Sequence, residues 1–469
     1  MKNLLLSITL LLAFTASTVK AQLNPKFTSR LQYVLDSTCN LYHIKGASAA
    51  VLVPNVGLWK GVYGISDIGK PITPDMLFGI ASNTKTYVSS IMLKLQEMGK
   101  LSINDTLGKW FQHVPNVNGK ITIKQILNHT SGLFDYTQNP HFNDSIVADF
   151  HRIWKPEEML PFIMVPDFKP GTSWEYSNTN YLLAGLIIKQ VMNKPFEKTL
   201  RDFILVPQGL NNTIFFPQET SSAPVATPWS VVVSPNHAQE TLYNFPNFSL
   251  NSLFSLSSTA GAMMQTAEDN VNFWHALHAG EIINQSSLKQ MLTGVYLGTG
   301  PNGGSMFYGL GIFKYYDFYG KHTILEHGGS DVGYTNENAV DTVTGICFSL
   351  LSNQDSVNND TLLNDVIGAM QKATTEMKLA GTESVFNSTY DVQIYPNPAK
   401  DILTFNIENL TGISEISIYN MTGKEVLQSN LESGKSTINI DQLPSGLYVV
   451  QLVNKNDPTI FSQKIQISK

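Results

Sequence analysis

The stretch Leu77-Phe78-Gly79-Ile80-Ala81-Ser82-Asn83-Thr84-Lys85 ends an apolar segment and opens an amphipathic run. Ser82 and Lys85 are three residues apart, so on a helix their side chains lie on one face and can touch. A serine hydroxyl is a poor nucleophile until a neighbouring group takes its proton, and a lysine in a confined site can be that group. The pair therefore indicates a nucleophilic serine, although a serine that only caps a helix gives the same pattern.

Two other places in the chain have the same spacing, so the context has to decide. Ser17 and Lys20 lie in an N-terminal segment that resembles a cleaved leader. Ser286 and Lys289 lie in a polar helix start, where capping explains the serine. We therefore select Ser82, which follows apolar residues and opens a long helical pattern.

The N-terminus has the parts of a secretory signal peptide. Lys2 gives a basic start, residues 4–14 are almost wholly apolar, and residues 19–21 fit a small-residue cleavage site. The apolar segment is too short to span a bilayer. We predict that residues 1–21 are a signal peptide and that the protein is exported through the outer membrane, either secreted or held at the cell surface.

The composition fits a folded, mildly acidic chain of more than one domain. The 469 residues are 42% hydrophobic and 14% charged, as expected for a chain with a buried core. Without the signal peptide, 29 basic residues face 37 acidic ones, and the formal charge moves from −6 to −8. That balance argues against a nucleic acid partner. No cluster has a metal-site spacing, so we predict neither metal nor cofactor.

Cys39 and Cys347 are the only cysteines, too few for a disulfide scaffold. Export would permit one bridge between them, but we favour two separate buried thiols.

Hydrophobic periodicity divides the mature chain into a mixed unit at 25–375, a polar linker at 376–390 and an all-β sandwich at 391–469. Strands at both ends of the first unit predict an α/β sandwich whose first and last strands are neighbours, with the terminal helices on one face. Its predicted helices are 27–42, 84–97, 123–127, 180–192, 267–277 and 362–374, and its predicted strands are 47–53, 58–63, 308–316, 323–326 and 346–352. In the tail we predict strands at 402–407, 416–419, 436–440, 447–453 and 460–467.

Residues 207–254 have no clear period and are rich in Pro, Asn and Ser. Long irregular stretches inside compact domains are often functional. The aromatic residues Tyr243, Phe245, Phe248 and Phe254 either line a cleft or simply pack this stretch.

A serine and a lysine need further partners: a second proton-handling group, an oxyanion hole and orienting donors. Tyr-x-Asn supplies a phenol and an amide, and it occurs at Tyr176/Asn178, Tyr334/Asn336 and Tyr395/Asn397. Only the first copy immediately precedes a strong amphipathic helix, which holds short side chains rigidly. His327-Gly328-Gly329-Ser330 follows a predicted strand, and its glycines let the backbone approach a ligand.

Together these motifs resemble the serine β-lactamase-like family, in its class C β-lactamase, D-alanyl-D-alanine carboxypeptidase and esterase branch. The Ser-x-x-Lys motif is Ser82/Lys85, the Tyr-x-Asn motif is Tyr176/Asn178, and His327-Gly328-Gly329 replaces the Lys-Thr-Gly motif. The matching flanks are 77–82, 99–105, 129–133 and 308–311. The tail resembles a type IX secretion sorting domain through 395–399, 422–424 and 444–448.

The resemblance implies an antiparallel sheet flanked by helices, with a helical subdomain. It implies that Ser82 becomes acylated, that Lys85 and Tyr176 share the proton work, and that Asn178 orients the substrate amide. The backbone N–H groups of Ser82 and Ser330 would form the oxyanion hole, and the 207–254 stretch the lid. The resemblance does not decide which of Lys85 and Tyr176 is the base. If Tyr176 is the base, its pKa has to be lowered, and we expect a charged Lys85 beside it to do so.

The third motif departs from the family pattern because His327 stands where β-lactamases have a lysine. A neutral imidazole anchors a substrate carboxylate less well than an ammonium. We therefore predict a secreted serine hydrolase acting on an ester or a D-amino-acid amide or peptide, with secretion machinery as the partner of the tail. The alternatives are a β-lactamase, a catalytically silent penicillin-binding-like scaffold, and an adhesion role for the tail.

Overall fold

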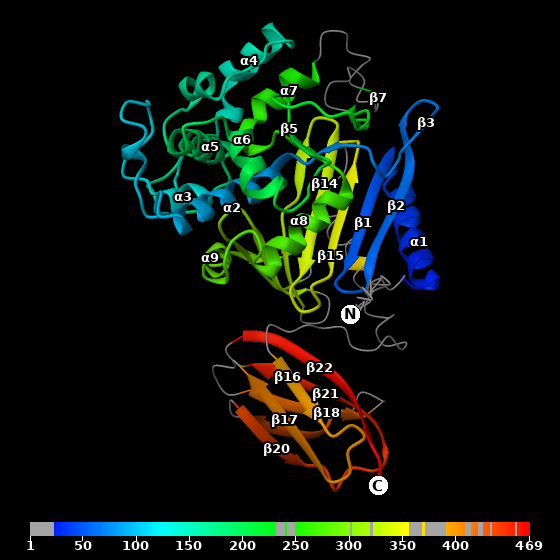
Figure 1. Ribbon diagram of the computed structural model, residues 1–469. Helices are drawn as coiled ribbons and strands as arrows, with labels where there is room; N and C mark the ends of the chain where they lie inside the picture. Colours follow the sequence, from blue (N-terminus) through cyan, green and yellow to red (C-terminus); the bar gives the residue numbers. More distant parts are fainter. Residues whose placement is uncertain are drawn as a thin grey trace, which may run out of the picture.

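A computed structural model describes most of the chain (Figure 1). The described residues are 23–230, 240–241, 249–300, 303–318, 322–355, 368–370, 391–408, 414–420, 425–431, 434–454 and 457–469. The predicted signal peptide at 1–21, the predicted linker at 376–390 and three of the aromatic residues in the irregular stretch (Tyr243, Phe245 and Phe248) lie outside these ranges. Within them, no helix has the length and apolar character needed to cross a membrane.

A ten-stranded sheet forms the centre of the first unit, with the order β3-β2-β1-β15-β14-β12-β11-β10-β9 and with β13 paired to β14. Its strands are β1 (Gly46–Val53), β2 (Gly57–Asp67), β3 (Lys70–Pro71), β9 (Val295–Thr299), β10 (Ser305–Tyr308), β11 (Phe313–Phe318), β12 (His322–Glu326), β13 (Gly329–Asp331), β14 (Tyr334–Asp341) and β15 (Cys347–Ser352). The neighbouring strands pair antiparallel. The first strand pairs with the last, Ala47 opposite Ser352, as predicted.

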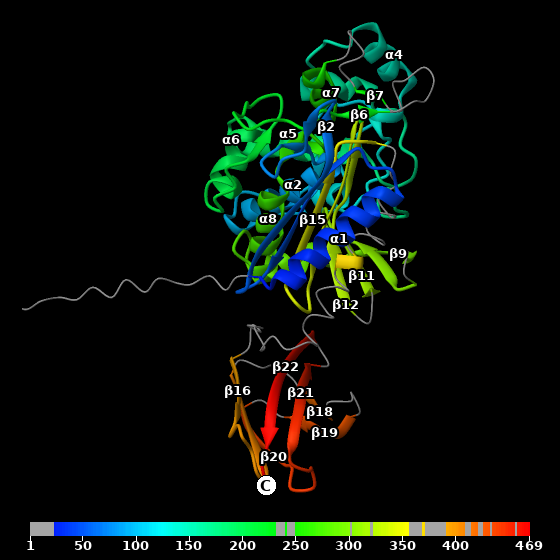
Figure 2. The same cartoon turned by 90° about the vertical axis from the view of Figure 1, so that its right-hand side faces the viewer.

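Helices cover both faces of this sheet (Figures 1 and 2). Successive side chains of a strand point to opposite faces, so a strand with apolar residues at successive positions needs a packing partner on each face. Ala47, Ala49 and Val51 of β1 share a core with α1 (Pro25–Leu41). Ala50 between them joins the core that contains α8 (Ala267–Ala279) on the other side. Met370 also packs in the α1 core, so the described part of the predicted last helix lies where we expected it.

A helical layer packs beyond α8 and carries most of the motifs. It contains α2 (Thr84–Glu97), α3 (Ile123–Leu127), α4 (Pro140–Ala148), α5 (Asn178–Met192), α6 (Phe196–Leu200), α7 (Leu250–Ser257) and α9 (Gln285–Met291). Short helical turns connect them: η1 (Ala81–Asn83), η2 (Leu107–Lys109), η3 (Tyr136–Gln138), η4 (Pro156–Phe162), η5 (Arg201–Leu205) and η7 (Ser258–Ala260). Small strands complete the layer: β4 (Phe78–Gly79), β5 (Thr213–Phe215), β6 (Trp229–Ser230), β7 (Glu240–Thr241) and β8 (Met263–Gln265).

One expectation about this unit needs correction, and one alternative is decided. The predicted strand at 308–316 is a hairpin, in which β10 ends at Tyr308 and β11 begins at Phe313. Gly311 between them has φ +71°, a conformation that ends a strand and suits glycine. Of the two alternatives for Phe254, packing is the one confirmed, because its side chain is fully buried in the main core.

The two cysteines are free and buried, as we favoured. Cys39 belongs to the core beneath α1, whereas Cys347 belongs to the core on the α8 side. They therefore lie on opposite faces of the sheet and cannot form a bridge.

The tail is an all-β unit with its own hydrophobic core, as predicted. One sheet has the order β16-β17-β20 and the other β19-β18-β21-β22. The strands are β16 (Asp391–Tyr395), β17 (Ile402–Glu408), β18 (Ser414–Asn420), β19 (Glu425–Leu431), β20 (Gly434–Asn439), β21 (Gly446–Asn454) and β22 (Asp457–Ile467). Our sequence reading missed β16 and β19, and it found the other five.

Candidate active site

Ser82 lies in η1, the short turn that leads directly into α2. One helical turn later, Lys85 places its Nζ 2.9 Å from the Ser82 Oγ, where it donates a hydrogen bond. The Ser82 side chain is partly exposed, whereas Lys85 is fully buried. The predicted pair thus forms at the N-terminal end of a buried helix, with only the serine open to solvent.

Lys85 donates two further hydrogen bonds, to the Asn178 Oδ1 at 2.9 Å and to the Ala260 backbone oxygen at 2.8 Å. These three acceptors match the three N–H groups of an ammonium. Burial nevertheless lowers the pKa of Lys85 to about 7, while the charges of Asp135 and Asp331 act in the raising direction. Near neutral pH, a large fraction of this lysine is therefore an uncharged amine.

Tyr176 lies with its ring over the lysine, the Lys85 Nζ being 4.7 Å from the ring centre. Burial raises the pKa of Tyr176 well above its ordinary value, and the neighbouring Ser82 hydroxyl acts in the lowering direction without reversing that effect. The expected lowering by a charged Lys85 is therefore not what the site provides. The phenol oxygen is buried and makes no hydrogen bond of ordinary geometry to the described residues.

Asn178 is the first residue of α5, and Asp135 holds its side chain in place. The Asp135 carboxylate accepts hydrogen bonds from the Asn178 backbone N–H at 3.1 Å and from its Nδ2 at 2.9 Å. This arrangement turns the amide oxygen of Asn178 toward the Lys85 ammonium. The same carboxylate accepts from the backbone N–H and the hydroxyl of Thr137, so Asp135 also caps a helical turn.

His327 is almost completely buried, with 2% of its surface exposed. Its Nδ1 lies 2.7 Å from the Gly328 carbonyl, which can only accept, so Nδ1 carries the proton. Its Nε2 then accepts from the Tyr308 hydroxyl at 3.2 Å. Burial and the Lys85 charge lower the pKa of His327 to about 3, while the bond to Gly328 acts in the raising direction. The imidazole is thus neutral and fully engaged, which makes it a poor anchor for a carboxylate.

The glycine strand β13 passes directly beside the serine turn. A Cβ added to Gly329 would lie 2.9 Å from the Ser82 nitrogen and 2.2 Å from the Ile80 oxygen. Only glycine therefore permits this approach. The next residue, Ser330, is exposed, and the strand brings its backbone near that of Ser82.

Asp331 follows Ser330 and is partly buried. Its carboxylate accepts hydrogen bonds from the Ser257 hydroxyl at 2.9 Å and from the Val332 backbone N–H at 2.8 Å. Burial raises the pKa of Asp331, whereas these bonds and the Lys85 charge act in the lowering direction.

His129 packs against the tyrosine, with 4.3 Å between the His129 and Tyr176 ring centres. Its Nδ1 accepts from the Ser177 backbone N–H at 3.1 Å. Burial lowers the pKa of His129 well below its ordinary value. We conclude that this neutral ring has a structural role, supporting the Ser177 backbone and the Tyr176 side chain.

The rival motifs lie elsewhere. Ser286 and Lys289 lie on α9, where Asn284 caps the helix by accepting from the Ser287 backbone N–H at 3.0 Å. Tyr334 and Asn336 lie on the buried strand β14. Tyr395 belongs to the tail.

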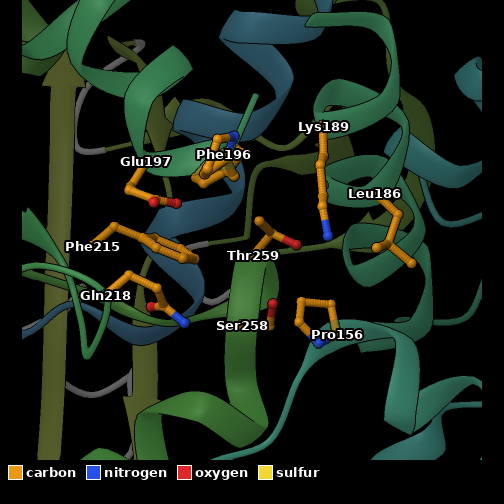
Figure 3. A pocket seen from close by; sticks show the side chains of 11 residues that line it. Pro156, Leu186, Lys189, Phe196, Glu197, Phe215, Gln218, Ser258 and Thr259 are labelled. Carbon is orange, nitrogen blue, oxygen red and sulfur yellow. The ribbon is translucent and has the colours of Figure 1, made fainter. Parts of the chain in front are cut away.

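Figure 3 shows a separate pocket of about 210 Å³. Phe196, Phe215, Leu186 and Lys189 line it, together with Ser258 and Thr259 of η7. It shares η7 with the site, because Ala260 of that turn accepts from Lys85. None of the candidate catalytic, oxyanion-hole or orienting residues selected from the sequence lines this pocket, whereas Phe215 and Gln218 of the 207–254 stretch do.

The sequence reading missed three parts of this arrangement: Asp135, Asp331 and the Ala260 carbonyl. Asp135 lies two residues after the 129–133 motif, which is a weak signal of its importance. A backbone carbonyl leaves no trace in a sequence pattern. Asp331 adjoins the glycine motif, but nothing in its spacing points to Ser257.

Comparison with known proteins identifies the first unit. The beta-lactamase family model matches residues 32–369, which is most of the chain. The chain belongs to the beta-lactamase family. A second match covers residues 393–468 of this beta-lactamase-family protein and corresponds to a secretion system C-terminal sorting domain. That match indicates export through a type IX secretion system.

Relatives of the beta-lactamase-family unit include penicillin-binding proteins and amidases. Protein flp of Staphylococcus aureus is 32% identical over 242 residues, covering 50% of this chain and 45% of that protein. The chain thus spans about half the length of the curated relatives that it matches. Among solved structures, a D-stereospecific amidohydrolase from a Streptomyces species is 27% identical with a TM-score of 0.62, over 72% of this chain and 98% of that chain. D-amino acid amidase from Ochrobactrum anthropi is 25% identical with a TM-score of 0.64, over 75% of this chain and 99% of that chain.

Proposed function

We propose that this protein is an exported hydrolase in which Ser82 attacks the acyl carbon of an ester or of a D-amino-acid amide or peptide. The observation that carries the proposal is the contact between Ser82 and a buried lysine whose pKa is about 7. A serine becomes nucleophilic when an adjacent base accepts its proton, and an amine with this pKa is such a base at neutral pH.

Lys85 is the better candidate for the base, because burial moves its pKa toward neutrality and moves that of Tyr176 away from it. In the first step, the Ser82 oxygen bonds to the acyl carbon while its proton passes to the neutral Lys85 amine. The resulting oxyanion accepts hydrogen bonds from the backbone N–H groups of Ser82 and Ser330. The acyl–leaving-group bond then breaks, and the leaving group takes a proton from the Lys85 ammonium through the Tyr176 hydroxyl.

Hydrolysis of the acyl-enzyme repeats these steps with water as the nucleophile. Lys85 takes a proton from water, the new oxyanion occupies the same hole, and the Ser82 oxygen leaves with the returning proton. Tyr176 keeps its own proton on balance throughout, as its raised pKa requires. Asn178 would contact the acyl group, and its hydrogen bonds to Lys85 and Asp135 beside the serine support this role.

The charges around the site favour a substrate without an essential carboxylate. Three carboxyl groups lie close enough to act on the pKa values of Lys85 or Tyr176. They belong to Asp135, Asp331 and Glu326. His327, which occupies the position of the family's lysine, is neutral. An anionic β-lactam would meet repulsion there. Two of the solved structures named above are a D-stereospecific amidohydrolase and a D-amino acid amidase, and this supports an amide substrate for our protein as well.

The tail supplies the route of export in this proposal. A sorting domain at 393–468 supports recognition by type IX secretion machinery. The predicted signal peptide at 1–21 would first bring the chain across the inner membrane, and release at the outer membrane or attachment to the cell surface would follow.

The test is intact-mass spectrometry and turnover of the mature chain with four reagents. These are a fluorophosphonate, a penicillin, a D-amino-acid amide or D-Ala-D-Ala peptide, and a short-chain ester. We expect a fluorophosphonate adduct on Ser82 and turnover of an ester or amide, with both lost in Ser82→Ala. Ser286→Ala is the matched control, because Ser286 has the same Ser-x-x-Lys spacing on α9, and it should behave as wild type.

Turnover that survives Ser82→Ala would overturn the proposal. A chain without any adduct or turnover would be the silent scaffold, and rapid hydrolysis of penicillin alone would make the protein a β-lactamase.

A further inference from the structure

The second Tyr-x-Asn copy, which plays no part in the proposed chemistry so far, places Asn336 behind the oxyanion hole. Asn336 lies on β14, opposite Gly329 of β13. Its side chain is completely buried. The Nδ2 donates to the Gly329 carbonyl at 3.1 Å and to the Gly79 carbonyl at 3.4 Å. One amide nitrogen therefore contacts two strands that do not pair with each other.

These two carbonyls belong to the segments that carry the proposed oxyanion donors. Gly329 immediately precedes Ser330, and Gly79 lies three residues before Ser82. The two segments approach so closely that a Cβ on Gly329 would lie 2.9 Å from the Ser82 nitrogen and 2.8 Å from the Asn336 Nδ2. The Asn336 amide thus donates hydrogen bonds to both segments that carry the proposed donors.

A buried relay fixes the orientation of this amide. The Asn336 Oδ1 accepts from the Asn338 Nδ2 at 2.7 Å, and the Asn338 Oδ1 accepts from the Ser349 hydroxyl at 2.7 Å. All three side chains are fully buried. A flipped Asn336 would turn its oxygen toward two carbonyl oxygens and leave the Asn338 donor without an acceptor, which is costly in a buried site. The relay therefore aims the two N–H bonds at Gly79 and Gly329.

We propose that Asn336 is a positioning residue for the oxyanion hole, holding the Ser82 and Ser330 backbones at the separation that a tetrahedral oxyanion needs. The proposal rests on the proposed function, because it assumes that these backbone N–H groups are the donors. Donors must lie about 2.7–3.1 Å from the oxyanion. A displacement of about 1 Å in such a site costs about 100-fold in rate. Asn336 would act through the backbones of Gly79 and Gly329, to whose carbonyls it donates.

Asn336→Leu tests this role, since leucine has a similar shape but neither donor. We expect kcat/KM for an ester to fall about 100-fold while KM changes little. The decisive readout is the ratio of ester to thionoester hydrolysis, because a sulfur anion profits less from N–H donors than an oxyanion. That ratio should fall in Asn336→Leu. Loss of folded protein would lower both rates equally and leave the ratio unchanged.

Thr335→Val is the matched control. Thr335 is the neighbouring residue on β14, is equally buried, and its hydroxyl has no hydrogen-bond partner among the described residues. We expect wild-type rates and a wild-type ratio. If Asn336→Leu does not fold, Asn336→Asp is the second variant, because it keeps the acceptor for Asn338 but lacks the amide donors. Above pH 7, its ratio of ester to thionoester hydrolysis should fall in the same way.

The outcomes separate this proposal from the proposed function. A wild-type ratio in a folded Asn336 variant, in a protein whose turnover depends on Ser82, would overturn the positioning role alone. Turnover that is independent of Ser82 would overturn the proposed function, and the positioning role with it.

Discussion

Lys85 should set the pH dependence of acylation. Its amine must be uncharged to accept the Ser82 proton, and burial places its pKa at about 7. The active fraction therefore rises with pH, by about tenfold between pH 6 and pH 8. We expect kcat/KM for a neutral ester to follow this rise and to level off above it. A pH–rate profile measured with a p-nitrophenyl ester would show it.

Neighbouring groups allow this pH profile to be assigned to Lys85. Burial lowers the pKa of His327 to about 3 and that of His129 well below its ordinary value, so neither titrates near pH 7. Asp135 raises the pKa of Lys85, and Asp135→Asn should therefore move the rise in activity to lower pH. A profile that does not change between pH 5 and pH 9, or one that Asp135→Asn moves upward, would contradict the role of Lys85 as the base.

At the residue scale, the sequence could predict the reacting groups but not the residues that support them. Ser82 and Lys85 are three apart on one helix, so their contact is local and readable. Asp135 reaches Asn178 across 43 positions, and Lys85 reaches Ala260 across 175. Such contacts depend on the packing of distant segments, which no spacing rule describes.

Gly329→Ala tests the close approach of β13 to the serine turn. The added Cβ would lie 2.2 Å from the Ile80 oxygen, and the backbone on both sides leaves little room to relax. β13 must then move away from η1, which separates the proposed oxyanion donors. We expect a loss of about 100-fold in kcat/KM and a destabilisation of about 1–3 kcal/mol. Steady-state kinetics and thermal unfolding measure the two effects, and wild-type kinetics in this variant would refute the tight approach.

At the element scale, long helices and buried strands were predictable because their apolar period is strong. The helix predicted at 84–97 is α2 with the same bounds. The hairpin at β10 and β11 was misread because Phe313 and Tyr315 continue an apolar pattern across the turn at Gly311. β19 was missed because Glu425–Leu431 alternates weakly, and its place is set by pairing with β18.

The hydrolase unit and the tail have separate hydrophobic cores, and we expect their functions to be independent as well. Among the residues that the structure describes, the tail's hydrophobic core contains none from 25–375. We expect that deletion of 391–469 leaves ester or amide turnover unchanged and abolishes delivery to the medium or the cell surface in a host with type IX secretion. Activity assays on cell fractions would measure both. Loss of turnover in a folded truncated chain would show that the tail contributes to catalysis, and continued delivery would show that another signal directs export.

At the scale of the whole molecule, the class of each unit was predictable from hydrophobic periods, and the family match agrees with it. The predicted boundaries at 25–375, 376–390 and 391–469 stay predictions, since the linker lies outside the described residues. Periodicity shows where a pattern changes, but it does not show which residues form the last contacts of a folded unit.

The pairing of β1 with β15 also governs when the hydrolase unit can fold. Residues such as Ala47 and Ser352, which face each other, are separated by roughly 300 positions, so the fold has a high contact order and should form slowly. A nascent chain that has not yet reached β15 leaves one edge of β1 without its partner, and such an edge attracts other strands. If the predicted signal peptide directs export, the same delay keeps the growing chain open while it crosses the inner membrane.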